Sequence, residues 1–167
     1  MQETAEEMEA LQALLDRSYR RAGEHLLSIH TPRWRMDAGQ VCEALEGVCV
    51  LDLATVSRAG APRVAPVDGL FLGGLFWFGS SRQSLRFRHI RNDPRVSAAH
   101  TVGEEVSVVV HGVAREIDTS TGDFERLHDY CRQVYGPDYD SWGYWGTAPF
   151  AWIEPERMYA IRIRHDA

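Results

Sequence analysis

A run of small, hydroxyl-bearing and basic residues holds the chain's clearest candidates for binding an anion. Residues 78–96 read FGSSRQSLRFRHIRNDPRV, with five arginines against a single acid. A strand ending in small residues leaves hydroxyl and backbone N–H groups open, and the N-terminus of a following helix adds partial positive charge. Arg82 and Arg86 lie four residues apart, which on a helix places both guanidiniums on one face toward a phosphate monoester. The candidate phosphate ligands are Ser80, Ser81, Arg82, Ser84 and Arg86, and the alternative is a solvated basic helix with a serine N-cap.

Histidines and tryptophans supply the other candidate ligand contacts. His89 can contact the ring of a cofactor, although a single histidine more often packs or caps. His100 and His111 fall on neighbouring predicted strands, but no third ligand accompanies them, so no metal site is predicted. Trp142 and Trp145 lie in a glycine-punctuated loop, where they can stack on a ligand or wall its pocket. Pinning that loop to the barrel surface is the equal alternative.

The sequence contains no conventional nucleophile, so the catalytic residues stay unknown. It has no GxSxG, P-loop or GxGxxG motif, and Cys131 has no base beside it in the sequence. Three cysteines without CxxC spacing indicate reduced, mostly buried thiols rather than a disulfide framework or a zinc site. A bound cofactor would make a catalytic constellation of side chains unnecessary.

Composition limits the class of protein. The 167 residues suffice for one domain with a core, and 44% hydrophobic and 25% charged residues are ordinary for a soluble globular protein. No apolar run approaches the roughly 20 residues that cross a bilayer. Residues 1–9 are acidic where a signal peptide is basic, so we expect a cytoplasmic protein without a membrane partner. The net charge of −6 argues against nucleic acid, whereas a local arginine cluster suits a small anionic ligand.

The first 46 residues predict a helical extension. Thr4 and Glu7 have capping-box spacing, and apolar residues follow at helical intervals to about Leu27. A second short helix is expected over residues 38–46. We expect residues 1–46 to pack on a barrel formed by residues 47–167, in a single domain overall.

From Gly47 the hydrophobic period is that of strands. Gly60 and the Gly73-Gly74 pair mark turns, and helices are expected over 84–91 and 121–135, the latter capped by Ser120 with Asp123 and ended by Gly136-Pro137. Strand segments are expected at 48–56, 63–67, 70–72, 75–78, 96–100, 105–117, 151–153 and 157–163. Six or seven strands in meander order predict a mainly β, antiparallel barrel with flanking helices.

Residues 53–67, LATVSRAGAPRVAPV, resemble the opening hairpin of the pyridoxamine-5′-phosphate-oxidase-like superfamily, the flavin and deazaflavin split barrels. The family's Ser-x-Lys/Arg-x-x-Asn-Leu-x-x-Asp/Asn-Pro-x-Val block is matched in spacing by residues 84–96, and residues 153–160 resemble its closing segment. The resemblance runs from about residue 47 to residue 163. Arg86 stands at the usual lysine and keeps its charge. His89 stands at the usual asparagine, which can alter the choice of cofactor.

The resemblance implies a Greek-key-like, antiparallel six- to seven-stranded split β-barrel that forms a homodimer with the cofactor at the interface. The residues that would line the cofactor's ring or phosphate arm are Arg63, Val64, Ala65 and Pro66, while Arg86 and the serines would hold the phosphate. The implied function is a flavin- or deazaflavin-dependent oxidoreductase that acts on a small organic substrate by hydride transfer.

FMN is the first choice of cofactor, and the deazaflavin coenzyme F420 is the alternative. The long anionic tail of F420 favours extra arginines, which Arg82, Arg88 and Arg91 could supply. A second hypothesis is a non-catalytic flavin- or haem-binding sensor or carrier on the same fold. A true pyridoxamine 5′-phosphate oxidase comes third, because no C-terminal substrate-binding arginine and histidine segment is recognisable after Arg157.

Overall fold

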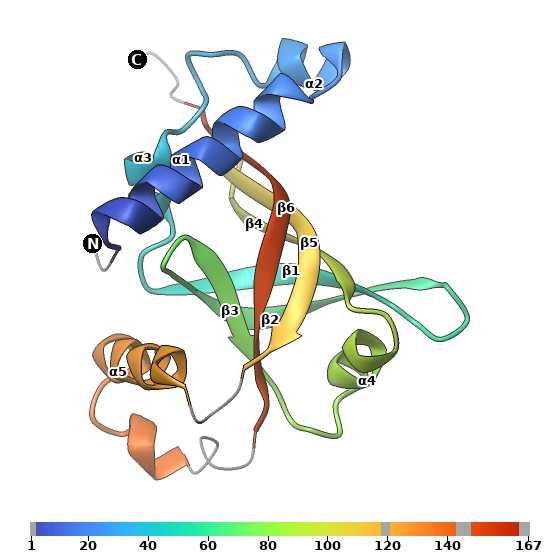
Figure 1. Cartoon of the computed structure of the whole chain (residues 1–167), viewed down its shortest axis with the longest axis vertical. Coiled ribbons are helices and arrows are strands. Elements are labelled where there is room, and N and C mark those ends of the chain that lie inside the picture. Colours follow the sequence, from blue (N-terminus) through green and yellow to red (C-terminus); the bar gives the residue numbers. More distant parts are fainter. Residues whose placement is uncertain (1–2, 118–120, 143–147, 164–167) are drawn as a thin grey trace.

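A computed structural model describes residues 3–117, 121–142 and 148–163 of the chain. Its centre is a closed six-stranded antiparallel barrel with strand order β1-β2-β3-β6-β5-β4, closed by pairing of β1 with β4 (Figure 1). The strands are β1 (Val48–Val56), β2 (Pro62–Leu72), β3 (Leu75–Gly79), β4 (Arg95–Val102), β5 (Val106–Glu116) and β6 (Phe150–Arg162). The predicted mainly β, antiparallel barrel with flanking helices is confirmed, but the predicted meander order is wrong, because β3 pairs with β6 rather than with β4.

Two strands are longer than the sequence predicts. The expected segments 63–67 and 70–72 form the single strand β2, and 151–153 and 157–163 form β6. Gly69 continues β2, since it pairs with Cys49 on β1 and Phe78 on β3. A Cβ there would lie 2.5 Å from Leu51 Cδ1, so a larger residue would require the Leu51 side chain to shift. Pro155 in β6 has no N–H to donate to β5. The register between the two strands shifts between His111 and Gly112, and at this β-bulge one ladder hydrogen bond is not needed.

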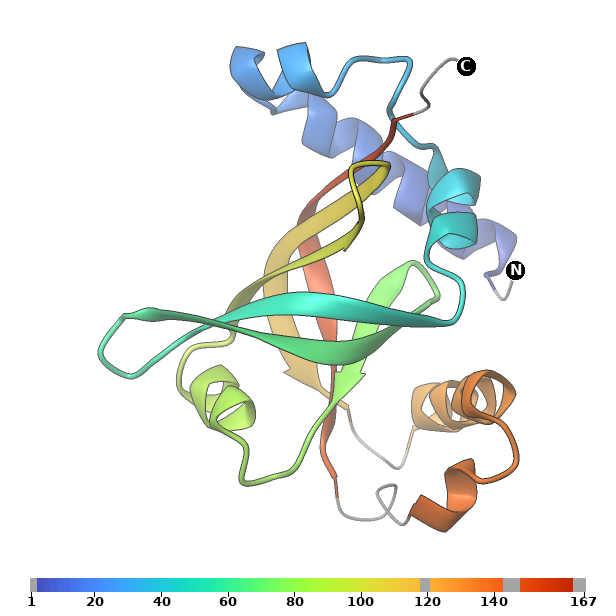
Figure 2. The ribbon, with the colours of Figure 1, turned by 180° about the vertical axis from the view of Figure 1, so that it is seen from behind.

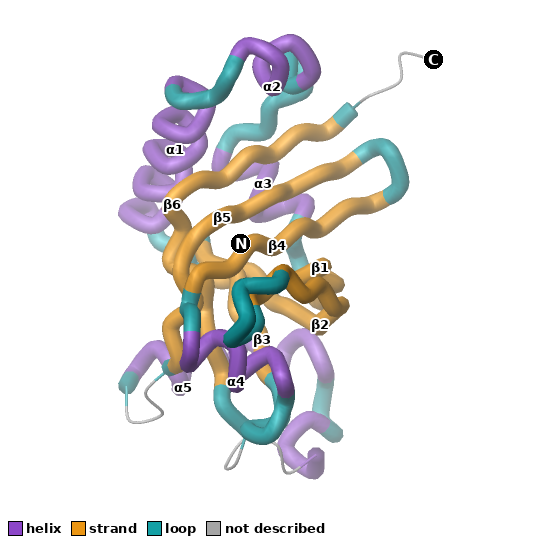
Figure 3. The backbone as a smooth tube through the Cα atoms, turned by 90° about the vertical axis from the view of Figure 1, so that its right-hand side faces the viewer, coloured by secondary structure: helices purple, strands orange, loops and turns teal. Residues whose placement is uncertain are grey.

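Three helices precede the barrel. α1 (Ala5–Arg20) begins at the predicted Thr4–Glu7 capping box but ends before Leu27; α2 (Glu24–Ile29) and α3 (Ala38–Ala44) follow. α1 lies along β6 (Figure 3), where the Ser18 hydroxyl accepts a hydrogen bond from the Met158 N–H at 2.9 Å. The Tyr19 hydroxyl likewise accepts one from the Ala160 N–H at 3.2 Å. The helix therefore satisfies backbone donors of the barrel as well as burying apolar surface.

Two helices flank the other end of the barrel on opposite sides (Figures 1 and 2). They are α4 (Leu85–Asn92) and α5 (Gly122–Tyr135), the latter followed by the short η1 (Tyr139–Trp142). Thr121 is the N-cap of α5 without a side-chain cap, and the predicted cap residue Ser120 lies outside the described residues. Gly136 ends α5 with a φ of +82°, as its position predicted.

The interior is divided between two apolar clusters. One fills the barrel and the underside of α1 and α3; the other joins β2 and β3 to α5 and η1 around Trp77, Leu127 and Tyr139. All three cysteines are buried and unpaired, and burial raises their pKa values, to about 11 for Cys49 and Cys131. Among the residues that the structure describes, no helix combines the length and the apolar character that a membrane crossing requires.

Candidate functional site

The first half of β2 is an open surface. β1 pairs with β2 along its whole length, whereas β3 pairs with it only from Gly69 to Leu72. One edge of the earlier residues is therefore free, and the hairpin projects from the barrel (Figure 2). The four residues that the resemblance places against a cofactor are all exposed here: Arg63, Val64, Ala65 and Pro66.

Arg86 is held against this open edge. The Ser84 hydroxyl caps α4 by accepting a hydrogen bond from the Phe87 N–H at 3.3 Å, and Phe87 itself is fully buried, which fixes the helix on the barrel. From this position Arg86 Nη2 donates a hydrogen bond to the Pro66 carbonyl oxygen at 2.9 Å. Burial lowers the pKa of the Arg86 guanidinium. The guanidinium is therefore partly desolvated, and no carboxylate among the described residues compensates its charge. An anionic ligand would supply that compensation.

The other arginines of the cluster behave differently from the prediction. Arg82 lies in the loop before α4, because the helix starts only at Leu85, so Arg82 and Arg86 do not share a helical face. Arg91 pairs with both carboxylate oxygens of Glu116, at 2.7 and 3.0 Å, and is not free for an anionic tail. Arg95 pairs with Asp93. Three arginines of this stretch make no ion pair within the described ranges: Arg82, Arg86 and Arg88.

The serines before α4 divide into two kinds. Ser84 caps the helix, and the Ser81 hydroxyl accepts a hydrogen bond from the Gln83 N–H at 3.3 Å, so both mainly shape the loop. Ser80 is fixed by its backbone N–H, which donates to the Pro149 carbonyl at 3.3 Å. Its hydroxyl makes no hydrogen bond to a described residue, and Ser80 lies at the edge of a pocket. Ser80 is therefore the serine best placed for a ligand.

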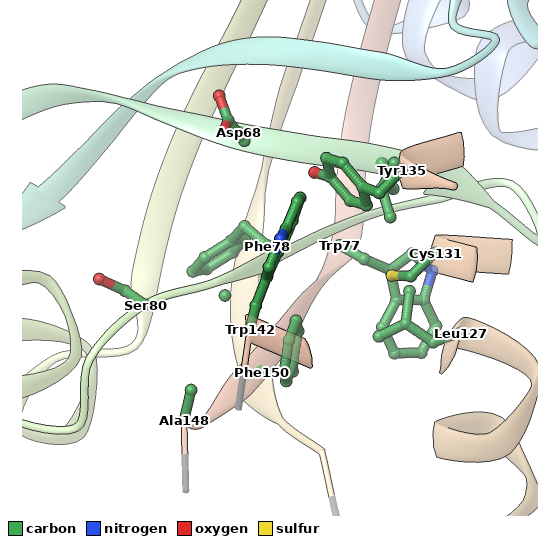
Figure 4. Close-up of a pocket in the computed structure, with 12 residues that line it drawn as sticks. Asp68, Trp77, Phe78, Ser80, Leu127, Cys131, Tyr135, Trp142, Ala148 and Phe150 are labelled. Carbon is green, nitrogen blue, oxygen red and sulfur yellow. The ribbon is translucent and has the colours of Figure 1, made fainter. Parts of the chain in front are cut away.

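A pocket of about 330 Å³ opens beside Ser80, between the barrel and α5 (Figure 4). Its volume lies in the usual range for small-molecule sites. Figure 4 shows aromatic rings filling its interior, with Asp68, Ser80 and Ala148 around the rim. Its lining residues are Asp68, Leu70, Trp77, Phe78, Gly79, Ser80, Leu127, Cys131, Tyr135, Trp142, Ala148 and Phe150.

Trp142 lines this pocket and also anchors η1. Its ring centroid lies 5.3 Å from that of Tyr135 and 6.0 Å from that of Tyr139, yet the residue remains 46% exposed. The ring contacts show that Trp142 pins this part of the loop, and its contact with a ligand stays a prediction. Trp145 lies outside the described residues. Sequence reasoning missed Asp68 and Tyr135, whose proximity depends on how α5 packs against β2.

His89 bridges α4 and β1. Its Nδ1 lies 2.9 Å from the Thr55 hydroxyl, and Thr55 is only 4% exposed. This contact places the histidine in a packing role next to the open half of β2. His100 Nδ1 lies 3.0 Å from the Val50 carbonyl, and His111 Nδ1 lies 2.8 Å from the Ser97 hydroxyl. No metal-binding group of three or more side chains occurs among the described residues.

The site thus consists of a half-buried arginine without an ion pair among the described residues, beside an open strand and an aromatic pocket on a closed antiparallel barrel. Residues 39–162 match the family model for pyridoxamine 5′-phosphate oxidase. The match spans most of the chain, and the protein belongs to this family. No curated protein matches the sequence closely enough to count as a relative.

Solved structures share this fold at low sequence identity. A conserved hypothetical protein from Mycobacterium tuberculosis superposes with a TM-score of 0.67 at 18% identity, over 83% of this chain and 95% of that one. The haem storage protein HutZ from Vibrio cholerae gives 0.63 at 16% identity, over 74% and 93%. An FAD-binding protein from Mesorhizobium loti gives 0.59 at 21% identity, over 77% and 96%. At these identities the similarity establishes the fold alone.

Proposed function

We propose that the protein binds a flavin-type cofactor, FMN before any other, and is an oxidoreductase that transfers hydride to or from a small organic substrate. The observation that carries the proposal is the link between the anion-binding residues and the pocket. Arg86 is hydrogen-bonded to Pro66 on β2, and Ser80 belongs both to the loop before α4 and to the pocket lining. A cofactor held by its phosphate at Arg86, with its flat ring along the exposed half of β2, would leave the adjoining pocket open for a substrate.

The residues present fit such a cofactor. Arg86, with Arg82 and the Ser80 hydroxyl, would hold the phosphate through charge-assisted hydrogen bonds. The exposed residues Arg63 to Pro66 would lie along the ring. The bound flavin supplies the two-electron chemistry, so this chain's own residues need only bind, orient and shield the reacting groups.

The pairing of the arginines favours FMN over coenzyme F420. With Arg91 and Arg95 held by carboxylates, Arg82 and Arg88 are the cations of this stretch that remain beside Arg86. Three arginines without ion pairs in the described part of the chain suit the single compact phosphate of FMN better than the long anionic tail of F420. F420 stays the alternative cofactor, to be tested side by side with FMN.

A homodimer with cofactor sites at its interface is part of the proposal. Val48 and Val50 on β1 and Val64 on β2 share the outer face of the hairpin, and they are 41%, 54% and 68% exposed. Exposed aliphatic residues grouped on one strand pair are typical of a protein interface. Sedimentation of the purified chain should give twice the monomer mass, and a monomer at micromolar concentration would refute this part.

A haem-binding carrier is the second candidate, and His89 is the residue that favours it. Its Nδ1 is engaged by Thr55, which leaves Nε2 as the nitrogen for an iron. A haem-binding protein should show a Soret band that His89→Ala removes. The non-catalytic flavin carrier is separated from the enzyme by turnover, since only the enzyme passes electrons from a nicotinamide or to an acceptor.

The absorbance spectrum of the native protein, with mass spectrometry of what denaturation releases, tests the proposal. We expect flavin absorption bands and the mass of FMN. A colourless protein that binds neither FMN nor F420 at micromolar concentration would refute flavin binding. A Soret band with no flavin would favour the haem carrier instead.

A further inference from the structure

The pocket beside Ser80 has an uneven distribution of charge. Among the twelve described residues that line it, Asp68 is the one that is charged at neutral pH, and none of the twelve is an arginine, a lysine or a histidine. The cationic residues of α4 and its preceding loop therefore lie outside the pocket itself. Among the described lining residues, a charged ligand that enters meets a carboxylate and no compensating cation.

Asp68 lies where β2 passes from its exposed half to its buried half. It stands opposite Val50 on β1, which offers no polar side chain. Its carboxylate makes no ion pair or hydrogen bond with any residue of the described ranges, so no neighbour fixes its orientation. An uncompensated carboxylate at the rim of an apolar pocket attracts cations and repels anions.

The walls add a second attraction for a cation. Tyr135 and Trp142 face the pocket from α5 and η1, with ring centroids 5.3 Å apart, and Phe78 and Phe150 enclose it from the barrel (Figure 4). Aromatic faces attract organic cations and accept flat rings by stacking. Burial, together with the charge of Asp68, raises the pKa of Tyr135 to about 12, so its phenol stays neutral and adds no second negative charge.

We propose that this pocket binds a small aromatic or cyclic organic cation and that Asp68 is the residue that selects it. Substrates whose ring end carries a phosphate or a carboxylate are excluded from the pocket by the same charge. As an account of the substrate, the inference rests on the proposed function, because the pocket opens next to the surface assigned to the cofactor. As an account of ligand binding, it depends only on the pocket.

Three ligands of nearly equal size test the proposal: phenethylamine, 2-phenylethanol and 3-phenylpropionate. Each is titrated by calorimetry into the full-length protein with whatever cofactor it carries. We expect the amine to bind most tightly and the carboxylate most weakly. Asp68→Asn should weaken amine binding about fivefold, the upper value for one exposed ion pair, and leave the alcohol unchanged. Asp68→Glu should retain the preference for the amine.

Glu125→Gln is the matched control, because it removes one negative charge from an exposed residue of α5 that does not line the pocket. It should leave all three affinities unchanged. Equal binding of amine and carboxylate, or an Asp68→Asn protein that keeps the preference, would overturn the proposal. A chain that selects the amine through Asp68 yet binds no flavin would instead refute the proposed function and leave this inference standing.

Discussion

Arg86 on α4 donates a hydrogen bond to the carbonyl oxygen of Pro66 on β2, over 2.9 Å and across twenty residues of sequence. The contact uses one of the five N–H donors of the guanidinium. Among the described residues, the other donors make no hydrogen bond and no carboxylate lies within ion-pair distance of the guanidinium. A partly desolvated cation is thus fixed in place beside an open strand, which is the basis for proposing that it holds an anionic group.

The hydrogen bond between Thr55 and His89 should stabilise the packing of α4 on β1. We expect Thr55→Val to lower the free energy of unfolding by about 1 kcal/mol, since the valine keeps the shape but not the hydroxyl. Urea denaturation of the two single variants and the double variant with His89→Ala measures the coupling. A coupling of about 0.5–1 kcal/mol is expected, and strictly additive effects would show that the contact contributes nothing.

The ion pair between Glu7 and Arg126 should make the docking of α1 sensitive to acid. The hydrogen bond from Arg126 holds the pKa of Glu7 below its ordinary value of 4.5, against the opposing effect of burial. A carboxyl whose pKa is lowered in the folded state contributes stability above its unfolded pKa, and that stability is lost as the pH falls through the folded pKa.

Glu7→Gln should therefore lower the free energy of unfolding at pH 7 by about 0.5–1 kcal/mol, a modest value because Arg126 is partly exposed and screened. The difference from the wild-type protein should shrink as the pH falls below about 4.5, because the Glu7 carboxyl becomes protonated first in the unfolded and then in the folded state. Glu9→Gln, an exposed change on the same helix, is the control. A difference that persists unchanged at pH 3 would contradict the assignment.

Gly112 should be irreplaceable at the bulge between β5 and β6. A Cβ there would lie 2.1 Å from the backbone oxygen of Glu154, so the two strands would have to separate. We expect Gly112→Ala to lower the free energy of unfolding by about 2–3 kcal/mol. Gly39→Ala serves as the comparison, because its Cβ would meet nothing closer than 3.4 Å and alanine favours a helix. Equal stability of the two variants would disprove the steric argument.

Local signals predicted most of the fold. The Thr4–Glu7 capping box, the Gly73-Gly74 turn and the apolar run of β1 each depend on neighbours a few residues away, and each was confirmed at or near its predicted bounds. The same reasoning failed where the outcome depends on distant packing. It divided β2 at Gly69, although the fit of that glycine against Leu51 is set by the pairing of two strands.

The candidate site shows the same division. The importance of Arg86 could be predicted from its spacing and from the family resemblance. The pairing of Arg91 with Glu116, 25 residues away, could not, and it removes one of the cations expected to be free. Asp68 and Tyr135 come together only when α5 packs beside the barrel. No pattern within either segment indicates that the two residues line one pocket.

The central claim is that Arg86 holds the phosphate of a flavin cofactor, and a fluorescence titration of the cofactor-stripped protein with FMN tests it most directly. Arg86→Ala should weaken FMN binding by about 2–3 kcal/mol, or about 30- to 150-fold, as for the loss of a charged hydrogen bond. Arg88→Ala removes the same charge from an exposed position on the same helix and should change the affinity less than about threefold. An Arg86→Ala protein that binds FMN as the wild type does, or an equal loss in both variants, would contradict the account.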